Sequence, residues 1–295
     1  MSRFKEALAS DKFLITAAVP SPKGTNLDPF HKGLEALSGL VDAVNLSEAR
    51  SARIHMGSPA ACVIAGNAGL EPIYTLSCRD RNRLAACSEL LGVHALGIRN
   101  VLCVTGDYFN YGDTPDAKPV YDLDSVQAIE MVRELEAGRD AGGNDLDGAA
   151  AFCVGCVANP QADPLKPHLL KLEKKLSAGA EFIQTLDIYD MDAASPFFEK
   201  MKGRNIKVLA GVRLVTAREV GLWEKGKLPG NDIPEGIRAE IKGLDDEAEM
   251  LQKAGSRMAE MIRQIKNAGL CGGVHLTLDG HEERLRGILE EAGVR

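Results

Sequence analysis

Short apolar runs alternate with longer amphipathic stretches along almost the whole chain. The apolar runs have the length and continuity of strands that are buried on both faces of a parallel sheet. They predict eight strands, at Phe13–Val19, Val41–Leu46, Pro72–Ser77, Asn100–Thr105, Ala149–Val157, Glu181–Leu186, Lys207–Val212 and Gly273–Leu278.

The stretches between these runs repeat apolar residues at helical spacing, so each predicts a helix. These helices fall at Asp28–Gly39, Pro59–Ala68, Arg81–Leu96, Asp124–Ala137, Pro164–Ala178, Asp192–Lys202, Thr216–Lys225, Asp245–Ala268 and Glu282–Ala292. Eight strand–helix pairs within 295 residues favour a (β/α)8 TIM barrel, with a doubly wound open sheet as the alternative.

The segment Glu71–Asp107 shows this pattern most completely, because strand, loop, helix and strand follow one another without a break. Its predicted helix carries an apolar face of Leu84, Cys87, Leu90, Leu91 and Ala95. The segment therefore predicts one βαβ unit, with its polar loops at the carboxyl ends of the strands, where barrels and open α/β sheets bind ligands.

No stretch rich in Pro, Gly or Ser divides the chain, so we expect residues 1–295 to form a single domain. The segment Gly138–Gly148 is polar and glycine-rich and predicts an exposed loop. The segment Lys225–Lys242 contains two prolines and three glycines, which predicts an elaborated loop that could act as a lid over the barrel mouth.

Composition narrows the function classes. A net charge of −7, with basic residues scattered among acidic ones, argues against nucleic acid or an anionic membrane as the main partner. No window reaches ~18 uninterrupted apolar residues, and the first residues lack the apolar core of a signal peptide. The seven cysteines lie mostly in apolar segments, so we expect buried free thiols and a cytoplasmic protein.

Two groups of polar residues are candidates for a site. Thr105, Gly106 and Asp107 directly follow an apolar strand, where glycine permits close backbone approach and Asp107 serves either a ligand or a helix cap. Asn159 follows the fifth strand and Lys175 lies on the next helix. An Asn-Pro pair usually starts a turn and a helical lysine is usually solvated, so these two residues have a structural explanation as well.

The segment from Thr75 to Asp107, with its Cys-Arg-Asp-Arg-Asn-Arg and Gly-Ile-Arg-Asn-Val-Leu-Cys-Val-Thr-Gly-Asp runs, resembles the short bacterial methylenetetrahydrofolate reductases. The resemblance extends from about Leu14 to Leu278. It implies a flavoprotein barrel of one-carbon metabolism, with FAD, or FMN instead, as cofactor.

The same resemblance implies roles for individual residues. Asp107 would lie near the flavin ring, tune it and touch the folate. The residues implied to hold the flavin are Ser47, Thr75, Thr105, Gly106, Tyr121, Asn159 and Lys175.

Two positions depart from the family pattern. The family's glutamate in the first strand, taken to be the general acid, corresponds to Ala18, and its folate-binding glutamine corresponds to Leu186. Gln184 lies two residues from Leu186 and would share its strand face, so it is the candidate substrate-binding residue. Glu48, Asp187 or a water could replace the lost acid, whose absence would cost ~10²–10⁴-fold in rate.

Other motifs point to no further chemistry. Cys153 and Cys156 are three residues apart on a predicted strand, so their side chains would point to opposite faces and no metal site is expected. The six histidines form no ligand cluster, and His275 would point either into the barrel or away from it. Nucleotide-binding glycine loops and a serine-hydrolase elbow are absent.

Two functions follow from the resemblance. In the first, the protein is an oxidoreductase that reduces 5,10-methylenetetrahydrofolate, or a related pterin, to the 5-methyl form by hydride transfer from flavin N5. Its electron donor would be NAD(P)H or a partner iron–sulfur or flavin subunit. In the second, it is a non-reducing flavin- or folate-binding subunit of an electron-transfer or methyl-transfer complex. Exposed helix faces suit a homo-oligomer or a partner subunit in both cases.

Overall fold

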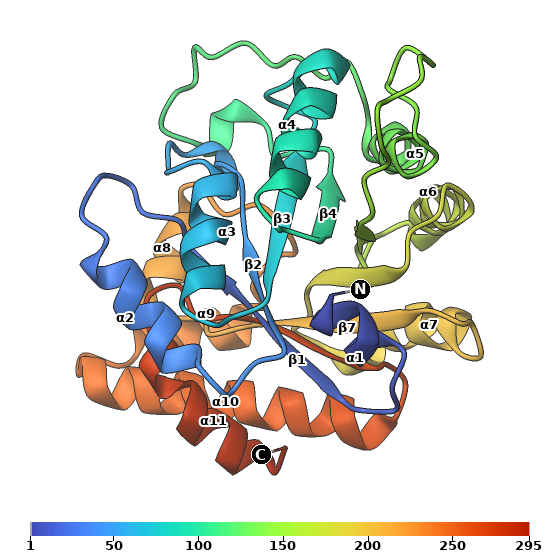
Figure 1. The fold of residues 1–295 in the computed structure, drawn as a ribbon. Helices are drawn as coiled ribbons and strands as arrows, with labels where there is room; N and C mark the ends of the chain where they lie inside the picture. Colours follow the sequence, from blue (N-terminus) through green and yellow to red (C-terminus); the bar gives the residue numbers. More distant parts are fainter. Residues whose placement is uncertain (1, 295) are drawn as a thin grey trace.

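Eight parallel strands close into a barrel in the computed structural model, which describes residues 2–294 (Figure 1). Each strand pairs with its neighbours in chain order, and β8 pairs with β1 to close the ring. The strands are β1 (Leu14–Val19), β2 (Ala43–Leu46), β3 (Pro72–Ser77), β4 (Asn100–Val104), β5 (Cys153–Ala158), β6 (Phe182–Asp187), β7 (Lys207–Arg213) and β8 (Gly273–Thr277). The predicted (β/α)8 barrel is confirmed, and the open sheet is excluded.

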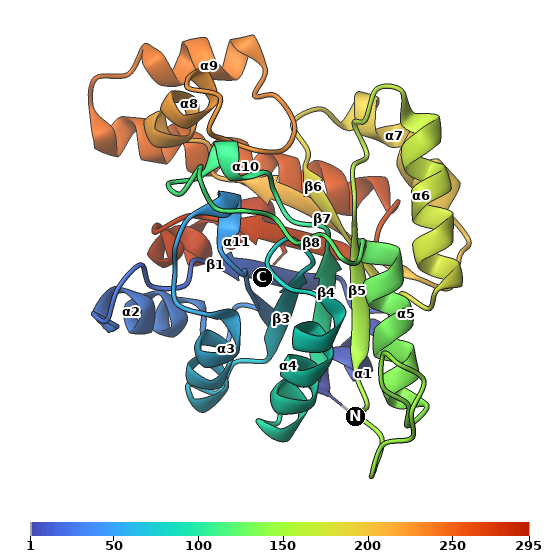
Figure 2. The same ribbon diagram turned by 90° about the horizontal axis from the view of Figure 1, so that it is seen from above.

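All the predicted helices are present and pack around the barrel (Figures 1 and 2). They are α2 (Asp28–Leu37), α3 (Ser58–Asn67), α4 (Arg83–Ala95), α5 (Ser125–Glu136), α6 (Leu165–Ser177), α7 (Met191–Met201), α8 (Ala217–Glu224), α10 (Glu247–Ala268) and α11 (Leu285–Ala292). Their buried faces meet the outward-pointing residues of the strands in one continuous apolar layer.

The interior of the barrel is filled at its amino-terminal end. Phe4 and Phe182 are fully buried there, with ring centroids 5.2 Å apart in an edge-to-face arrangement. Gly155 leaves the space that Phe182 occupies, because a Cβ at that position would lie 2.2 Å from the Phe182 ring. The aromatic pair and the first inward residue of most strands therefore form an apolar floor beneath the cavity.

Phe4 belongs to α1 (Arg3–Leu8), a short helix that the sequence pattern did not predict. The Ser2 hydroxyl caps this helix by accepting the Lys5 N–H at 3.1 Å, and it donates to Asn100 at the start of β4 at 2.6 Å. Six residues are too few to show helical periodicity, and the helix is held by Phe4 rather than by an amphipathic face. Figure 2 shows α1 at one end of the strands and α8 and α9 beyond the other end.

The prediction of an elaborated loop at Lys225–Lys242 is wrong for its second half, which forms helix α9 (Glu235–Lys242). Pro234 precedes the helix, and Ile237 and Ile241 are buried one turn apart. The first half is irregular, and Leu228–Gly230 reaches the barrel mouth.

Helix α4 buries fewer of its apolar residues than predicted. Cys87 and Leu90 are buried, whereas Leu84 and Leu91 are 76% and 38% exposed. The buried stripe contains Ala86 and Val93 instead, because α4 packs on the sheet through a narrow face. Within residues 2–294, no helix is both long and apolar enough to cross a membrane.

Candidate active site

A cavity of about 620 Å³ opens at the carboxyl ends of the strands, and every strand or the loop after it contributes to its lining. Most of the residues proposed from the sequence line it: Ser47, Thr75, Thr105, Gly106, Asp107, Asn159, Lys175 and Gln184. Tyr121 does not line the cavity; its hydroxyl lies 3.5 Å from the Gly106 carbonyl oxygen, and its ring meets Tyr108 edge-on. The structure therefore brings together residues from distant parts of the chain.

Asp107 lies just beyond the end of β4 and faces this cavity. Its Oδ2 accepts the Ser51 N–H at 3.2 Å, and Arg79 Nη1 donates to its backbone carbonyl at 3.1 Å. Burial raises the pKa of Asp107 above its ordinary value, although Arg79 and Arg50 partly offset the effect. The carboxylate is thus fixed by one backbone donor and leaves its other oxygen for a ligand.

Gly106 is required by the close packing of this loop. Its φ of +97° is in the left-handed region, and a Cβ would lie 2.5 Å from Ser77 Oγ and 2.7 Å from Arg79 Cβ. A larger residue at this position would displace Arg79, Asp107 or both. The glycine therefore sets the position of the aspartate beside the cavity.

A basic edge of the cavity is formed by helix α6. His168, Lys171 and Lys175 lie three and four residues apart, so they share one helical face, and all three line the cavity. Lys175 is buried, and its Nζ donates to the Val157 carbonyl at 2.7 Å. Burial lowers the pKa of Lys175. This edge suits an anionic group such as a phosphate.

Gln184 lines the cavity and has an unpartnered polar atom. Its side chain is buried, and within residues 2–294 its Oε1 has no hydrogen-bond partner. A bulge between Gln184 and Asp187 shifts the pairing of β6 with β7, and Leu186 lines the same cavity. An orphan buried acceptor costs about 1–3 kcal/mol, so this atom is suited to a donor on a bound molecule.

Ala18 lies on β1 and lines the cavity between Asn45 on β2 and Thr277 on β8, its partners in the sheet register. None of these three side chains carries an ionisable proton. His275 lies nearby on β8, points into the barrel and bonds Thr16 Oγ1 through Nδ1 at 3.0 Å. Burial lowers the pKa of His275 to about 3, so the ring is neutral at pH 7.

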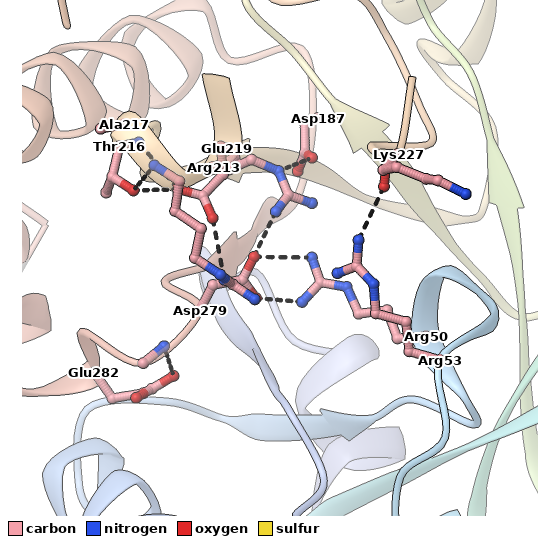
Figure 3. A network of polar contacts seen from close by, with 12 residues as sticks. Arg50, Arg53, Asp187, Arg213, Thr216, Ala217, Glu219, Lys227, Asp279 and Glu282 are labelled. Carbon is pink, nitrogen blue, oxygen red and sulfur yellow. Dashed lines mark hydrogen bonds and ion pairs between the residues drawn. The ribbon is translucent and has the colours of Figure 1, made fainter. Parts of the chain in front are cut away.

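An ion-pair network at the mouth was not predicted from the sequence (Figure 3). Asp279, just after β8, binds Arg50 through two contacts and Arg213 at 2.7 Å, and Arg213 Nε also binds Asp187 at 2.6 Å. Burial alone would raise the pKa of Asp279, but Arg50 and Arg213 outweigh it and lower the pKa to about 2. A charged residue at the end of each of three predicted strands was the available signal.

A smaller pocket of about 50 Å³, the basic side pocket, adjoins the main cavity and shares part of its lining. Its cationic residues are Arg50, Arg53, Arg213 and Arg218. Arg218 pairs with Glu219. The Arg53 guanidinium has no carboxylate partner within residues 2–294 and donates to the Lys227 carbonyl at 3.2 Å (Figure 3). The buried Ser21 hydroxyl in its wall has no partner among the described residues.

The cysteine pair behaves as predicted: Cys153 belongs to the floor inside the barrel, and Cys156 packs outward against the helices. Burial raises the pKa of the Cys153 thiol to about 12 and that of Cys156 to about 11. Both are free thiols. Within residues 2–294, no group of three or more His, Cys, Asp or Glu side chains is placed to hold a metal ion.

The chain matches known proteins over most of its length. The family model "Methylenetetrahydrofolate reductase" matches residues 3–293. A Caenorhabditis elegans protein named "Probable methylenetetrahydrofolate reductase (NADPH)" is 24% identical over 233 residues, which are 77% of this chain and 33% of the relative. The 5,10-methylenetetrahydrofolate reductase of Pectobacterium carotovorum is 23% identical over 205 residues, 68% of this chain and 63% of that protein. The chain thus spans about a third of the length of the nematode relative.

Among solved structures, a Clostridium thermocellum protein that binds two copies of 5-methyl-5,6,7,8-tetrahydrofolic acid has a TM-score of 0.65. The match covers 96% of both chains at 13% identity, and this likeness shows a shared fold.

Proposed function

This chain belongs to the methylenetetrahydrofolate reductase family, and from that premise we propose that its barrel mouth binds a flavin and a reduced folate. The proposed activity is reduction of 5,10-methylenetetrahydrofolate, or a related pterin, to the 5-methyl form. The observation that carries the proposal is the gathering of all but one of the predicted site residues around one cavity, although they come from separate strands and helices.

The residues of the cavity fit a flavin. Gly106 lets the backbone approach a flat ring system closely, and a Cβ there would collide with its neighbours. Lys175, with Lys171 and His168 beside it, would hold the phosphate, while Ser47, Thr75, Thr105 and Asn159 offer polar groups to the rest of the cofactor. Tyr121 would then act through the loop that holds Gly106. A bound flavin would supply the hydride.

Asp107 would serve as the main electrostatic residue of the reaction. Its carboxylate is oriented by the Ser51 N–H and lies in a partly desolvated place, where a charge acts more strongly on a bound molecule than in water. It would tune the flavin and accept a hydrogen bond from the pterin. The unpartnered Gln184 Oε1 would accept a second pterin N–H.

The acidic tail of a folate would suit the basic side pocket. Tetrahydrofolate ends in a glutamate, and the Clostridium thermocellum protein of the same fold binds a reduced folate of this kind. Arg53, which lacks a carboxylate partner within residues 2–294, and the free Ser21 hydroxyl would bind one carboxylate of that tail.

We propose FAD as the flavin, with FMN as the alternative. Mass spectrometry of the released cofactor distinguishes the two. The electron donor would be NAD(P)H or a partner iron–sulfur or flavin subunit. A rapid-mixing experiment with NADH and with NADPH distinguishes these donors. If NAD(P)H is the donor, it reduces the bound flavin without a partner subunit, and the flavin absorbance falls. We further propose that the protein is cytoplasmic. It would form a homo-oligomer or a complex with such a subunit.

A second function is favoured by one observation. Ala18 and Leu186 both line the cavity and replace the polar groups implied by the family pattern. A protein that binds flavin or folate without reducing it would tolerate both changes, and would serve an electron-transfer or methyl-transfer complex instead.

An absorbance experiment separates the two functions. The purified protein should be yellow, and its flavin, once reduced, should be reoxidised when 5,10-methylenetetrahydrofolate is added without oxygen, with 5-methyltetrahydrofolate as product. A flavin that stays reduced while folate binds would support the non-reducing subunit. Protein that carries no flavin and takes none up would overturn the proposal.

A further inference from the structure

Glu48 is a half-buried carboxyl group that faces the main cavity from the loop after β2. Its side chain is 12% exposed, and its two contacts are long: Oε2 accepts the Ser58 N–H at 3.3 Å, and Oε1 lies 3.4 Å from Arg81 Nη2. The cavity thus contains an acid, next to the strand that carries Ala18, whose charge is only weakly stabilised.

Glu48 competes with a second carboxylate for the same arginine. Arg81 Nε binds Glu89 Oε2 on α4 at 2.8 Å, a closer contact than that with Glu48. The Tyr74 hydroxyl also donates to Glu89 Oε1, so Glu89 receives two donors and is the better stabilised anion. Glu89 lies outside the cavity lining. Arg81 is therefore engaged mainly by Glu89, and its attraction for the Glu48 carboxylate is correspondingly weak.

The other groups around Glu48 leave its negative charge weakly stabilised. Cys62 on α3 is a buried neutral thiol, because burial raises its pKa to about 12. Burial raises the pKa of Glu48 itself; Arg81 and the Ser58 N–H oppose this effect, and Glu89 adds to it. The remaining cavity acids are fixed in other ways, since Asp187 binds Arg213 at 2.6 Å and Asp107 accepts the Ser51 N–H.

We propose that Glu48 holds a proton in the free protein and delivers it to the pterin, in place of the acid that Ala18 cannot provide. This inference rests on the proposed reduction of methylenetetrahydrofolate. The proton passes from the Glu48 carboxyl to N10 of the substrate as the bond between N10 and the methylene carbon breaks. The electron pair of that bond stays on N10, and the N5 lone pair forms the iminium that accepts hydride.

Arg81 is placed to stabilise the carboxylate that this step leaves. Its Nη2 lies 3.4 Å from Glu48 Oε1, and its Nη1 is buried with no partner within residues 2–294, so the guanidinium keeps an unused N–H pair for a small shift towards Glu48 when Glu48 ionises. A proton from solvent then restores the acid, because the cavity is open at the mouth. Arg81 is therefore a positioning residue, and Glu48 is the group that touches the substrate.

Glu48→Gln and Glu89→Gln test the proposal on the flavin-loaded protein. Glu48→Gln should slow reoxidation of the reduced flavin by methylenetetrahydrofolate by ~10²–10⁴-fold while 5-methyltetrahydrofolate still binds, because only the first process needs the proton. Glu89→Gln leaves Arg81 to Glu48 alone, so Glu48 should ionise at lower pH. The high-pH decline of the rate should then move to lower pH, a shift that a purely structural role would not produce.

Infrared difference spectra give a readout independent of turnover. Wild-type protein at neutral pH should show the C=O band of a protonated carboxyl that is missing from Glu48→Gln and weakened in Glu89→Gln. Glu283→Gln, at an exposed site, should leave band and rate unchanged. A band that survives in Glu48→Gln, or a rate that does not fall, overturns the assignment. If wild-type protein never oxidises its flavin with this substrate, the proposed function fails, while the band still reports on Glu48.

Discussion

Burial sets the pKa values of several individual residues at the barrel mouth. His275 is neutral because charging it inside the barrel would strip an imidazolium of its water. Asp107 and Glu48 have raised pKa values for the same reason. Asp279 is the exception, since two arginines outweigh the cost of burying it. The sign of each pKa shift thus follows from whether nearby opposite charges outweigh the cost of burying the charged form.

His275 should make the protein sensitive to mild acid. A histidine whose pKa falls from 6.5 to about 3 on folding contributes stability that is present above pH 6.5 and is lost as the pH falls towards 3. Between pH 7 and pH 5 this loss amounts to about 2 kcal/mol. Urea unfolding at both pH values should show that His275→Gln loses less than wild type does. His31→Gln, at an exposed site on α2, serves as the control and should match wild type.

Arg53 should matter for the folate tail and little for the pterin ring. Loss of a charge-assisted contact in Arg53→Gln should weaken binding of 5-methyltetrahydrofolate about ten- to a hundredfold, as measured by calorimetry. Binding of 6-methyltetrahydropterin, which has no acidic tail, should not change. Arg286→Gln, on the exposed face of α11, is the matched control. Equal losses for both ligands would show that Arg53 acts on the fold instead.

At the scale of elements, strands and long helices could be predicted because burial imposes a period on the sequence. The strand β3 has the predicted bounds, and the other strands differ at their ends. Helix α1 was missed because six residues carry too few turns to show a period. Helix α9 was missed because the prolines and glycines of Lys225–Lys242 predicted a loop. Phe4 holds α1, and Ile237 and Ile241 hold α9.

Phe4 should be the main anchor of α1. Phe4→Ala would remove a fully buried ring from contact with Phe182 and leave a cavity in the floor, at a cost of about 3–5 kcal/mol in the free energy of unfolding. Urea denaturation followed by circular dichroism measures this loss. Leu96→Ala, at a residue 57% exposed, should change stability by less than about 0.5 kcal/mol. A small loss in Phe4→Ala would mean that the floor is complete without α1.

At the scale of the whole molecule, the candidate site could be predicted in part. Sequence position placed Asp107 and Asn159 directly after strands, and the family resemblance pointed to Gln184 within the sixth strand. The barrel brings all three to one cavity. For the network of Arg50, Asp279, Arg213 and Asp187, the charged residues that end three predicted strands were a signal, but not of the pairing. Its members are far apart in sequence, and only the closed ring makes them neighbours. Pairing across loops is decided by side-chain direction, which no local pattern contains.

Asp279 should stabilise the whole mouth, since it joins the loop after β2 to the ends of β7 and β8. Asp279→Asn keeps the shape and suits the positive φ at this position, but leaves two arginines without their shared carboxylate. We expect a loss of about 3 kcal/mol in the free energy of unfolding. Differential unfolding in urea measures it, with the exposed Asp116→Asn as control. A variant as stable as wild type would show that the network serves ligand binding alone.

The floor made by Phe4 and Phe182 closes the amino-terminal end of the barrel, so the cavity is open at its carboxyl end. Whatever enters the cavity must leave by the route it came, past the loop at Leu228–Gly230. In the proposed flavin-dependent reaction, a reductant and a pterin that need the same place beside the flavin would not be bound at the same time. They would have to bind in turn, the first being released before the second binds.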